Sequence, residues 1–410
     1  MKYIYLISIL FFRFGIGIAA LFNNKAKLWV KGRQNWRKQL KKVNTDANTI
    51  WMHCASLGEF EQGRPLLEAI KNQHPNYQIV LTFFSPSGYE IRKNYQGADH
   101  IFYLPLDTAG NARHFINGIK PDVVVFVKYE FWYFFLQELK QRNIPTYLIS
   151  ALFRPDQAFF KWYGGLFKSM LFTFKHIFVQ QEDSAHLLNE KLNLENLTVA
   201  GDTRIDRVIR IAEESKRYEL VDYFCADKKV FVIGSSWPED EAILLPFIQN
   251  DINDKWKVII APHEIGETHI KQIEQQLDVP YVRYTEARKN DQLLNSKVLI
   301  VNNIGMLSSL YRYGKLAYIG GGFGKGIHNI LEPAAFKLPI VIGPKYQKFN
   351  EAIHLIQNKC AISVHNQEEL KSAFKQLNEK SRYDNAQTGI QRFLQQNKGA
   401  TAIILKELNL

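Results

Sequence analysis

The sequence predicts an α/β protein with two doubly wound parallel sheets, and three observations lead to this fold class. The chain has 410 residues, too many for one hydrophobic core, which indicates two domains of roughly 150–200 residues. Apolar runs rich in β-branched residues alternate with segments of helical length and period, as in parallel sheets covered on both faces. The pattern restarts after a polar, charged segment at 201–219, where we expect the domain boundary.

The first strand set consists of five short apolar runs. Helical segments lie between them, for example PLLEAIKNQ at 65–73 and FFLQELKQR at 134–142. The expected strands are TIWMHC (49–54), QIVLTFF (78–84), DVVVFV (122–127), TYLIS (146–150) and HIFVQ (176–180).

The second strand set follows the charged segment and has its own helices. Ligands of such folds bind beyond the carboxyl ends of the strands, so we expect the two domains to face a central cleft. Two last helical segments, at about 381–395 and 398–408, are placed to cross back onto the first domain. The expected strands are KVFVIGSS (229–236), WKVIIAP (256–262), KVLIVN (297–302), KLAYIGG (315–321) and LPIVIG (338–343).

The N-terminal segment is apolar and is followed by a basic flank. Stretch 3–22 is apolar except for Ser8 and Arg13, and it is long enough to span a bilayer. Because basic residues follow it, a cleaved signal peptide is disfavoured and the body is expected on the cytoplasmic side, against anionic lipid. A spanning helix, an interfacial helix with Arg13 reaching the surface, and a buried core helix remain open.

Charge and cysteine content limit the function classes. The formal charge of +12 raises the question of nucleic acid, but eight Lys and Arg with no acidic residue lie between positions 23 and 45, which favours a membrane surface. Cys54, Cys225 and Cys360 form no close pair. They argue against a disulfide framework or a cysteine-based zinc site and suit a reducing compartment.

The stretch HCASLGEFEQ (53–62) connects an expected strand to a helix that we expect to begin near Gln62. Glu59 is therefore either a first-turn carboxylate favoured by the helix dipole or a general base at the lip of the cleft, with a pKa raised by partial desolvation. His53 and Cys54 are interpreted as packing residues.

Other charged residues of the first domain also follow strands, so they are expected on the same side of the sheet. They are Lys128 and Glu130 in FVKYEFWYF, Arg154 in ISALFRP, and Arg204 in GDTRIDRV near the hinge. Each alone fits a solvated surface group, and their convergence favours a site.

A glycine-rich loop in YIGGGFGKGIHNILEPAAF (318–336) is the most informative stretch of the second domain. We expect a helix to begin near His328 and Asn329, so that free amides around Gly324 and Gly326 bind an anion. Glu332 in the first helical turn can accept hydrogen bonds from a ribose diol. The glycines do not match GxGxxG, which disfavours a dinucleotide.

Three further loops of the second domain follow strands. Together with the glycine-rich loop they predict a nucleotide site, and no Asp-x-Asp or close His/Asp/Glu cluster offers a metal site, so amides and cations must neutralise any phosphate. The loops carry Pro262 and His263 in IIAPHEIGE, Ile304, Gly305 and Met306 in NNIGMLSSLY, and Ser235 or Ser236 as an expected helix N-cap in GSSWPEDE.

These residues resemble the bacterial 3-deoxy-D-manno-octulosonic acid (Kdo) transferases of lipopolysaccharide synthesis. HCASLGE is similar to that family's His-Ala-Ala-Ser-Val-Gly-Glu signature, and the resemblance extends to the ISA segment, the GDTRID hinge motif and the GKGIHNILEPA loop. It covers most of the chain, including the apolar N-terminus and its basic flank.

The resemblance implies a GT-B fold with an anchor and basic flank at 1–45 and an acceptor-binding domain at 46–205. A CMP-sugar-binding domain would follow at 206–395, with a C-terminal helix at 396–410. Glu59 would be the general base, and Glu130 and Arg204 would stabilise the transition state. CMP would be bound by Pro262, His263, Ile304, Gly305, Met306, Asn329, Ile330, Leu331 and Glu332.

Two departures from the family pattern affect the nucleotide loops. APHEIGE lacks an arginine that the family carries there, and NNIGML lacks two carboxylates. Within the signature, Cys54 and Leu57 are mild replacements. Ser235, Ser236, Gly324, Gly326, Lys128 and Arg154 are expected as contacts of the phosphate or the donor carboxylate.

The resemblance thus implies inverting, metal-independent transfer of Kdo from CMP-Kdo to the 6′-hydroxyl of a lipid A precursor, lipid IVA. No cofactor and no nucleic acid are expected, and the enzyme would act at the cytoplasmic face of the inner membrane. One alternative is another GT-B enzyme, a UDP-sugar transferase or a UDP-N-acetylglucosamine 2-epimerase. The other is a non-catalytic membrane or nucleic-acid binding module that uses the basic flank.

Overall fold

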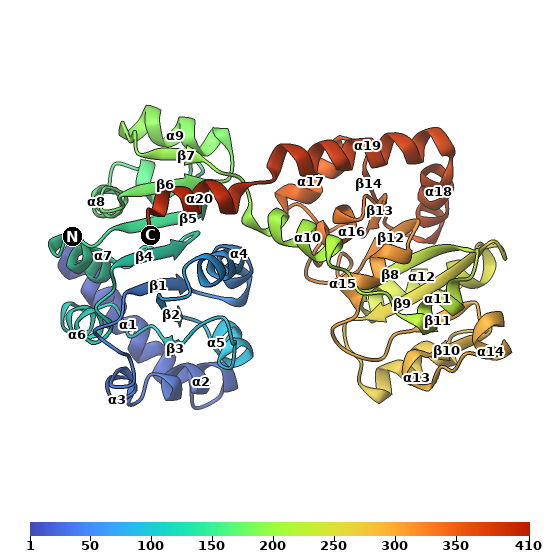
Figure 1. The fold of residues 1–410 in the computed structure, drawn as a ribbon, viewed down its shortest axis with the longest axis horizontal. Helices are drawn as coiled ribbons and strands as arrows, with labels where there is room; N and C mark the ends of the chain where they lie inside the picture. The colour runs from blue at the N-terminus through green and yellow to red at the C-terminus, as the bar shows by residue number, and fades with distance from the viewer. The chain divides into compact units, whose positions relative to one another are not determined.

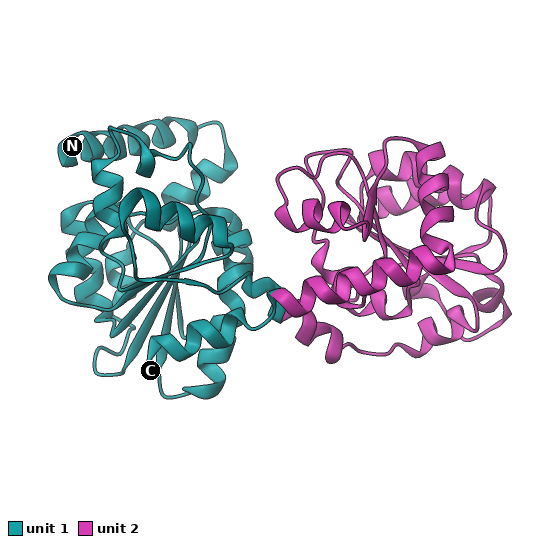
Figure 2. Cartoon of the chain, turned by 90° about the horizontal axis from the view of Figure 1, so that it is seen from above, with its two compact units in different colours: residues 1–206, 397–410 teal, residues 207–396 magenta.

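The structure, a computed structural model, describes all 410 residues. The chain forms two compact units (Figure 2): unit 1 comprises Met1–Asp206 with Asn397–Leu410, and unit 2 comprises Arg207–Gln396. Each unit contains one seven-stranded sheet in which all pairings are parallel. Helices cover both faces of each sheet (Figure 1), which confirms the predicted fold class.

The sheet of unit 1 has the order β3-β2-β1-β4-β5-β6-β7. Alternate residues of the first strand enter two different cores, because successive side chains of a strand point to opposite faces. Ile50, Met52 and Cys54 join one core, whereas Trp51 joins the other. The strands are β1 (Thr49–Cys54), β2 (Gln78–Phe83), β3 (His100–Tyr103), β4 (Val123–Val127), β5 (Thr146–Ala151), β6 (His176–Val179) and β7 (Leu197–Val199).

Unit 1 contains the helices at both ends of the chain. The C-terminal helix packs on the α4 side of the sheet, since Ile404 and Leu408 belong to the same core as Ile50. The helices are α1 (Lys2–Ala19), α2 (Asn24–Gly32), α3 (Trp36–Leu40), α4 (Leu57–Gln73), α5 (Pro86–Arg92), α6 (Ala109–Ile119), α7 (Tyr133–Gln141), α8 (Gly165–Leu171), α9 (Glu182–Leu192) and α20 (Ala400–Leu408). Helix α10 (Thr203–Glu213) begins in unit 1 and continues into unit 2.

The sheet of unit 2 has the order β10-β11-β9-β8-β12-β13-β14. Its strands are β8 (Lys229–Ser236), β9 (Trp256–Pro262), β10 (Tyr281–Arg283), β11 (Val298–Ile300), β12 (Leu316–Ile319), β13 (Ile340–Ile342) and β14 (Ala361–Ser363). Its helices are α11 (Glu219–Cys225), α12 (Pro238–Asn250), α13 (Glu267–Gln275), α14 (Asp291–Asn295), α15 (Leu307–Leu310), α16 (Leu331–Ala335), α17 (Asn350–Gln357), α18 (Gln367–Asn378) and α19 (Lys380–Asn397).

All ten predicted strands are present, and β3, β7, β10 and β14 were not predicted. These four are the edge strands of the two sheets and are only partly buried, whereas the equally short central strands β11 and β13 are fully buried and apolar. The expected start of α4 near Gln62 is wrong. The helix begins at Leu57 after Ser56 in extended conformation, so Glu59 lies inside its first turn.

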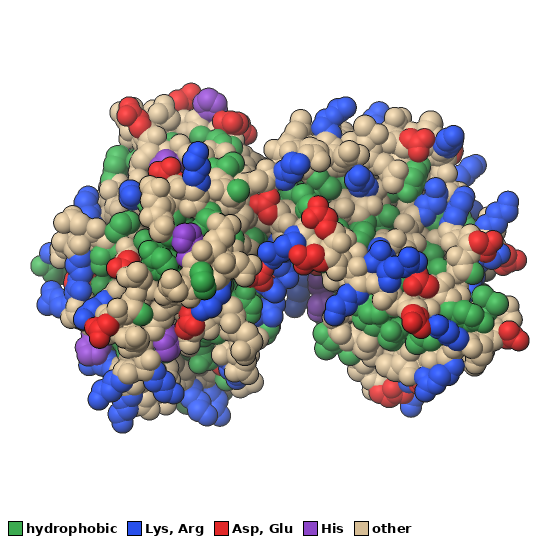
Figure 3. Space-filling model, viewed as in Figure 1, with side chains coloured by type: hydrophobic (Ala, Val, Ile, Leu, Met, Phe, Trp, Pro, Cys, Tyr) green, Lys and Arg blue, Asp and Glu red, His purple; other side chains and the backbone are tan.

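Helix α1 is long and apolar enough, by length and composition, to cross a bilayer. The alternative of a buried N-terminal core helix is wrong, because none of its residues is buried. Lys and Arg side chains of the basic flank gather over α2 and α3 (Figure 3).

Candidate active site

The candidate site of unit 1 lies where the strand order reverses. Strand β1 pairs with β2 on one side and with β4 on the other, so the β1/β4 junction is a topological switch point. Ligands of doubly wound sheets bind outside the carboxyl ends of the strands at such points. Glu59 follows β1 and Glu130 follows β4, so both predicted carboxylates flank this position.

The Glu59 side chain folds back onto the end of β1. The backbone N–H of Ala55 donates to Glu59 Oε2 at 2.5 Å. Burial and then the negative charge of Glu130 raise the pKa of Glu59 to about 8, while the Ala55 amide and the charge of Lys128 act in the opposite direction. A carboxyl with this pKa exchanges its proton near neutral pH, which suits an acid or base.

Glu130 is buried and held through one oxygen. Its Oε2 accepts hydrogen bonds from Trp132 Nε1 at 2.7 Å and lies 2.9 Å from His53 Nε2. Its Oε1 forms no hydrogen bond within the chain. Because Oε1 is not one of the fully buried side-chain atoms that lack a partner, it is accessible to solvent. The carboxylate is therefore fixed in direction while one oxygen stays free to contact a ligand.

His53 has a polar role that the sequence interpretation missed. The residue is fully buried, yet its Nδ1 lies 2.8 Å from Thr82 Oγ1, which also accepts from Trp51 Nε1 at 2.8 Å. A carboxylate oxygen only accepts, so His53 Nε2 donates to Glu130 Oε2. The interpretation of His53 as a packing residue is wrong, whereas Cys54 is a buried core residue. His53 and Glu59 belong to the same signature, HCASLGE, and this shared position is the sequence feature that could have indicated a polar role for His53.

The expected basic residues lie beside these carboxylates. Lys128 directly follows β4 in a left-handed backbone conformation, φ 69°, and its charge acts on Glu59. Burial raises the pKa of Tyr129, Arg154 lowers it and Glu59 raises it, so Arg154 and Glu59 both lie near the Tyr129 hydroxyl. The structure thus brings together the residues predicted on β4 and β5, and adds Tyr129.

Arg204 lies at the start of α10, and both oxygens of Asp202 hold its guanidinium. Arg204 Nη2 donates to Asp202 Oδ2 at 2.6 Å, and Nε lies within 3.1 Å of both oxygens. Two residues on, Asp206 accepts from the amides of Gly399 and Thr401 at the start of α20. The hinge motif therefore also secures the C-terminal helix.

In unit 2 the strand order reverses between β8 and β12, and three stacked rings lie beyond these strands. The His263 ring lies 4.5 Å from Trp237 and 4.4 Å from His328, centroid to centroid, and both pairs are nearly parallel. Trp237 Nε1 donates to His328 Nε2 at 2.8 Å. Burial and the neighbouring His263 lower the pKa of His328 to about 4, so this imidazole is neutral. Only His263 was predicted from sequence.

The serine N-cap expected before α12 is wrong. The N-cap is Trp237, whose amide donates to Asp240, while Ser236 is buried and donates to Glu241 at 2.8 Å. Ser235 has φ 55°, and its carbonyl leaves no space for a Cβ at position 320. Gly320 is therefore required by this close strand approach.

The glycine-rich loop is closed by its own hydrogen bonds. The amides of Gly324 and Gly326 both donate to the carbonyl of Gly321, so the free donors expected there are absent. Helix α16 begins at Leu331, later than the expected start near His328. Asn329 Nδ2 donates to Glu332 Oε1 at 3.1 Å, and Asn329 Oδ1 accepts from the Leu331 amide, while Ile330 is the N-cap.

The remaining predicted residues follow β9 and β11. Pro262 ends β9 and is buried. Ile304 is exposed, Gly305 has φ 93°, and Met306 is the buried N-cap of α15. No group of three or more His, Cys, Asp or Glu with metal-binding geometry is present in the chain.

Comparisons with known proteins place this geometry in a class. The structure resembles the UDP-GlcNAc 2-epimerase of Neisseria meningitidis (TM-score 0.61, 16% identity, 88% of this chain and 99% of that chain). It also resembles MurG of Acinetobacter baumannii (TM-score 0.55, 12% identity, 88% and 99%). These likenesses show a GT-B fold.

Sequence comparisons identify the class as glycosyltransferase. Residues 33–207 match the family model described as 3-Deoxy-D-manno-octulosonic-acid transferase (kdotransferase). The 3-deoxy-D-manno-octulosonic acid transferase of Rickettsia bellii is 29% identical over 362 residues, 85% of this chain and 84% of the relative. That of Chlamydophila psittaci is 26% identical over 311 residues, 72% and 70%. The chain is thus similar to the Kdo transferases, through the family model over residues 33–207 and through relatives over most of its length.

Proposed function

We propose that the protein transfers Kdo from CMP-Kdo to the 6′-hydroxyl of a lipid A precursor, with inversion and without a metal. The observation that carries the proposal is Glu59, a carboxyl with a pKa of about 8 at the switch point of unit 1, beside Glu130. Support for the sugar comes from the relatives, which are named as 3-deoxy-D-manno-octulosonic acid transferases.

In the proposed reaction, ionised Glu59 accepts the proton of the acceptor hydroxyl. The hydroxyl oxygen then forms a bond to the anomeric carbon of Kdo, and the bond from that carbon to the phosphate oxygen breaks, so CMP leaves with the electron pair. Proton transfer of this kind typically contributes about 10²–10⁴-fold. Glu130, fixed by His53 and Trp132, is proposed to stabilise positive charge that develops at the sugar.

The donor carries two anionic groups. Its sugar carboxylate is proposed to bind Lys128, Arg154 or Arg204, because guanidinium groups match carboxylates in geometry. In unit 2, the stacked rings of Trp237, His263 and His328 are proposed to contact the CMP moiety. CMP carries one phosphate, so cations and amide donors can balance its charge without a metal ion.

The acceptor is a lipid, and α1 is proposed to hold the enzyme at the membrane interface rather than to span it. One side of α1 packs on unit 1, where Tyr5 Oη donates to Asp107 at 2.6 Å. The other side exposes an apolar stripe at helical spacing: Tyr3, Ile7, Phe11, Phe14 and Ile18. A helix with these two faces fits the plane of a bilayer interface. We propose the cytoplasmic face of the inner membrane.

An exposed loop next to α1 supports this orientation. Trp162 is 95% exposed and Tyr163 is half exposed, and a Cβ at Gly165, two residues after Tyr163, would lie 3.1 Å from the Met1 side chain. Trp and Tyr are enriched at membrane interfaces, so this loop is proposed to enter the interface together with the start of α1.

Incubation of the enzyme with CMP-Kdo and lipid IVA, followed by mass spectrometry of the product, tests the function. Addition of Kdo is expected, and the Glu59→Gln variant should bind CMP but transfer at least about 10²-fold more slowly. Glu138→Gln is the matched control, because it makes the same chemical change on α7, where Glu138 pairs with Arg142.

Two outcomes would contradict the proposal. Near-normal turnover of Glu59→Gln would exclude Glu59 as the base. Tight binding of UDP with no binding of CMP would indicate a UDP-sugar enzyme instead.

A further inference from the structure

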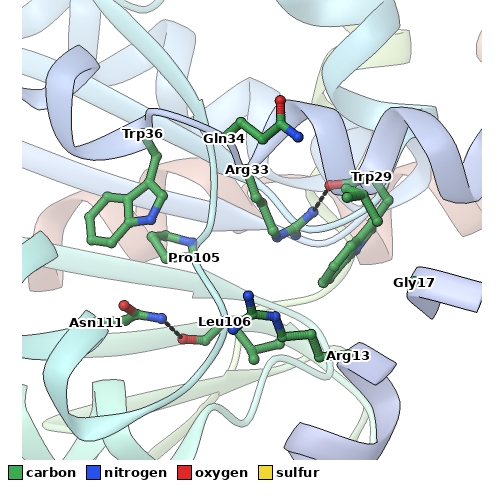
Figure 4. A pocket seen from close by; sticks show the side chains of 10 residues that line it. Arg13, Gly17, Trp29, Arg33, Gln34, Trp36, Pro105, Leu106 and Asn111 are labelled. Carbon is green, nitrogen blue, oxygen red and sulfur yellow. Dashed lines mark hydrogen bonds between the residues drawn. The ribbon is translucent and has the colours of Figure 1, made fainter. Parts of the chain in front are cut away.

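A cavity of about 350 Å³ lies beneath α1 in unit 1, and none of the residues assigned to the candidate active site lines it. Its walls come from α1, α2, the start of α3, the segment after β3 and the start of α6, and they include Arg13, Trp29, Arg33, Trp36 and Asn111 (Figure 4). Two arginines line it and no Asp or Glu does. The cavity therefore has a positive interior with aromatic walls.

Arg33 is a largely buried cation without a carboxylate partner. Its guanidinium donates to three backbone carbonyls, those of Leu104 at 2.9 Å, Phe84 at 2.7 Å and Trp29 at 3.2 Å. It also lies 3.8 Å from the Trp29 ring centroid. Burial lowers the pKa of Arg33 to about 9. A guanidinium has five N–H donors, so two remain after these bonds, and a buried positive charge favours an anion nearby.

Arg13 supplies a second cation from the opposite wall. It is the one charged residue inside the apolar stretch 3–22, it is exposed, and it forms no hydrogen bond or ion pair in the chain. In Figure 4, Arg13 from helix α1 and Arg33 from the C-cap of α2 extend into the same space. A charge on an apolar helix is costly at a membrane unless it has a polar partner.

The surroundings of the cavity indicate what kind of anion it takes. Arg13 and Gly17 line it from the same helix that exposes Phe11, Phe14 and Ile18. If this apolar stripe enters a bilayer, the helix lies at the level of the headgroups. A free phosphate ion would contact the arginines alone, whereas a lipid would place its phosphate between them and its acyl chains beside the stripe.

We infer that this cavity binds the phosphate headgroup of an anionic bilayer lipid, clamped between Arg13 and Arg33, at a place separate from the transfer site. The inference rests on the proposed association of α1 with the membrane. It assigns Arg13 the function of selecting anionic lipid, which a purely apolar anchor would not need.

Vesicle flotation tests the inference with two compositions, pure phosphatidylcholine and phosphatidylcholine containing phosphatidylglycerol. The variant Arg13→Gln is expected to lose about tenfold or more of the preference for phosphatidylglycerol, since charge-assisted hydrogen bonds are removed. Its binding to pure phosphatidylcholine should stay equal or rise, because α1 becomes less polar. Lys38→Gln is the matched control: an exposed residue of α3, whose loss should cost at most about fivefold by general charge attraction.

A solution measurement separates lipid from free phosphate and does not need membrane association. Calorimetric titration with monomeric dihexanoylphosphatidylglycerol should show binding to the wild type and weaker binding to Arg13→Gln and to the conservative Arg33→Lys. Inorganic phosphate should bind the wild type far more weakly.

Three results would overturn the inference: equal effects of Arg13→Gln and Lys38→Gln on vesicles, no binding of the short-chain lipid to the wild type, or equal binding of inorganic phosphate. Failure of wild-type protein to bind pure phosphatidylcholine would contradict the membrane association instead. CMP titration of Arg13→Gln should match the wild type, which separates this site from the transfer reaction.

Discussion

Glu59 experiences two opposing influences whose balance can be measured. Burial and the charge of Glu130 favour its protonated form, whereas the Ala55 amide and Lys128 favour the carboxylate. The result is a pKa of about 8 in the folded chain against an ordinary value of 4.5. The folded state therefore holds a proton that the unfolded state releases between these two pH values.

From this shift we predict the pH dependence of both stability and rate. The Glu59 contribution to the free energy of unfolding is fully present below about pH 4.5 and is lost as the pH rises to about 8. Between about pH 4.5 and pH 8, the free energy of unfolding of Glu59→Gln should rise by about 1 to 3 kcal/mol relative to that of the wild type. The transfer rate of the wild type should rise through about pH 8, and urea denaturation and rate profiles at several pH values check both expectations. A flat wild-type rate profile would contradict them.

His53 contacts the Glu130 carboxylate, and we expect the removal of its imidazole to destabilise the fold. In His53→Phe, Glu130 loses its contact with Nε2 and Thr82 loses its contact with Nδ1, so we expect a loss of about 1–3 kcal/mol in the free energy of unfolding. Met52→Leu is the control, because the side chain of this neighbour enters the core on the opposite face of the sheet. This substitution preserves volume and should lower the free energy of unfolding by less than about 1.5 kcal/mol. Denaturation curves of the two variants that coincide would show that the polar contacts contribute nothing.

At the scale of the element, Asp107 joins two helices. Its carboxylate caps α7 by accepting from the amides of Phe134 and Phe135, and it also accepts from Tyr5 Oη of α1. Burial raises the pKa of Asp107 to about 6, and the Tyr5 hydrogen bond lowers it. One buried carboxylate thus couples the position of α1 to the start of α7.

We therefore predict that Tyr5→Phe loosens the contact of α1 with unit 1. The variant loses a hydrogen bond to a charged acceptor, which contributes about 1.5–3 kcal/mol to the docking of α1. Amide exchange in α1 should therefore become about tenfold faster or more. Tyr3→Phe makes the same change at a residue that is 69% exposed and should leave exchange unchanged. Equal exchange rates in the two variants would show that Tyr5 does not anchor the helix.

At the scale of the whole molecule, the chain returns to unit 1 after completing unit 2. Helix α19 ends at Asn397, and Asp206 binds the amides of Gly399 and Thr401 before α20 begins its packing in unit 1. Ile404 is fully buried in that core, whereas the adjacent Ile403 is 42% exposed. The stability of unit 1 therefore depends on the last residues of the chain.

Ile404→Ala is expected to destabilise unit 1 by about 2–4 kcal/mol, because it leaves a cavity in the core. Hydrogen exchange should become faster in the core strands of unit 1 and remain unchanged in those of unit 2. Ile403→Ala is the matched control and should change exchange little. Equal acceleration in both units would contradict the assignment of α20 to the core of unit 1.

Local patterns were sufficient to predict much of the molecule. Near-continuous apolar runs identified the long central strands, since a parallel strand covered on both faces must be apolar on both. The residues directly after these strands, such as Glu59 and Glu130, could be placed on one edge of the sheet for the same reason. The four edge strands were missed because they are only partly buried and therefore do not form apolar runs, whereas central strands of the same length, such as β11 and β13, do.

The sequence by itself therefore determined the two-sheet fold, the apolar N-terminal helix and the placement of Glu59 beside Glu130. Only the tertiary structure decided that His53 and Trp132 hold Glu130 and that the Gly321 carbonyl accepts from the amides of Gly324 and Gly326. It also decided that Arg33 is half-buried and has no acidic partner. These features depend on hydrogen bonds and burial between residues far apart in the chain. No local pattern encodes which of several possible donors and acceptors the packed fold brings within bonding distance.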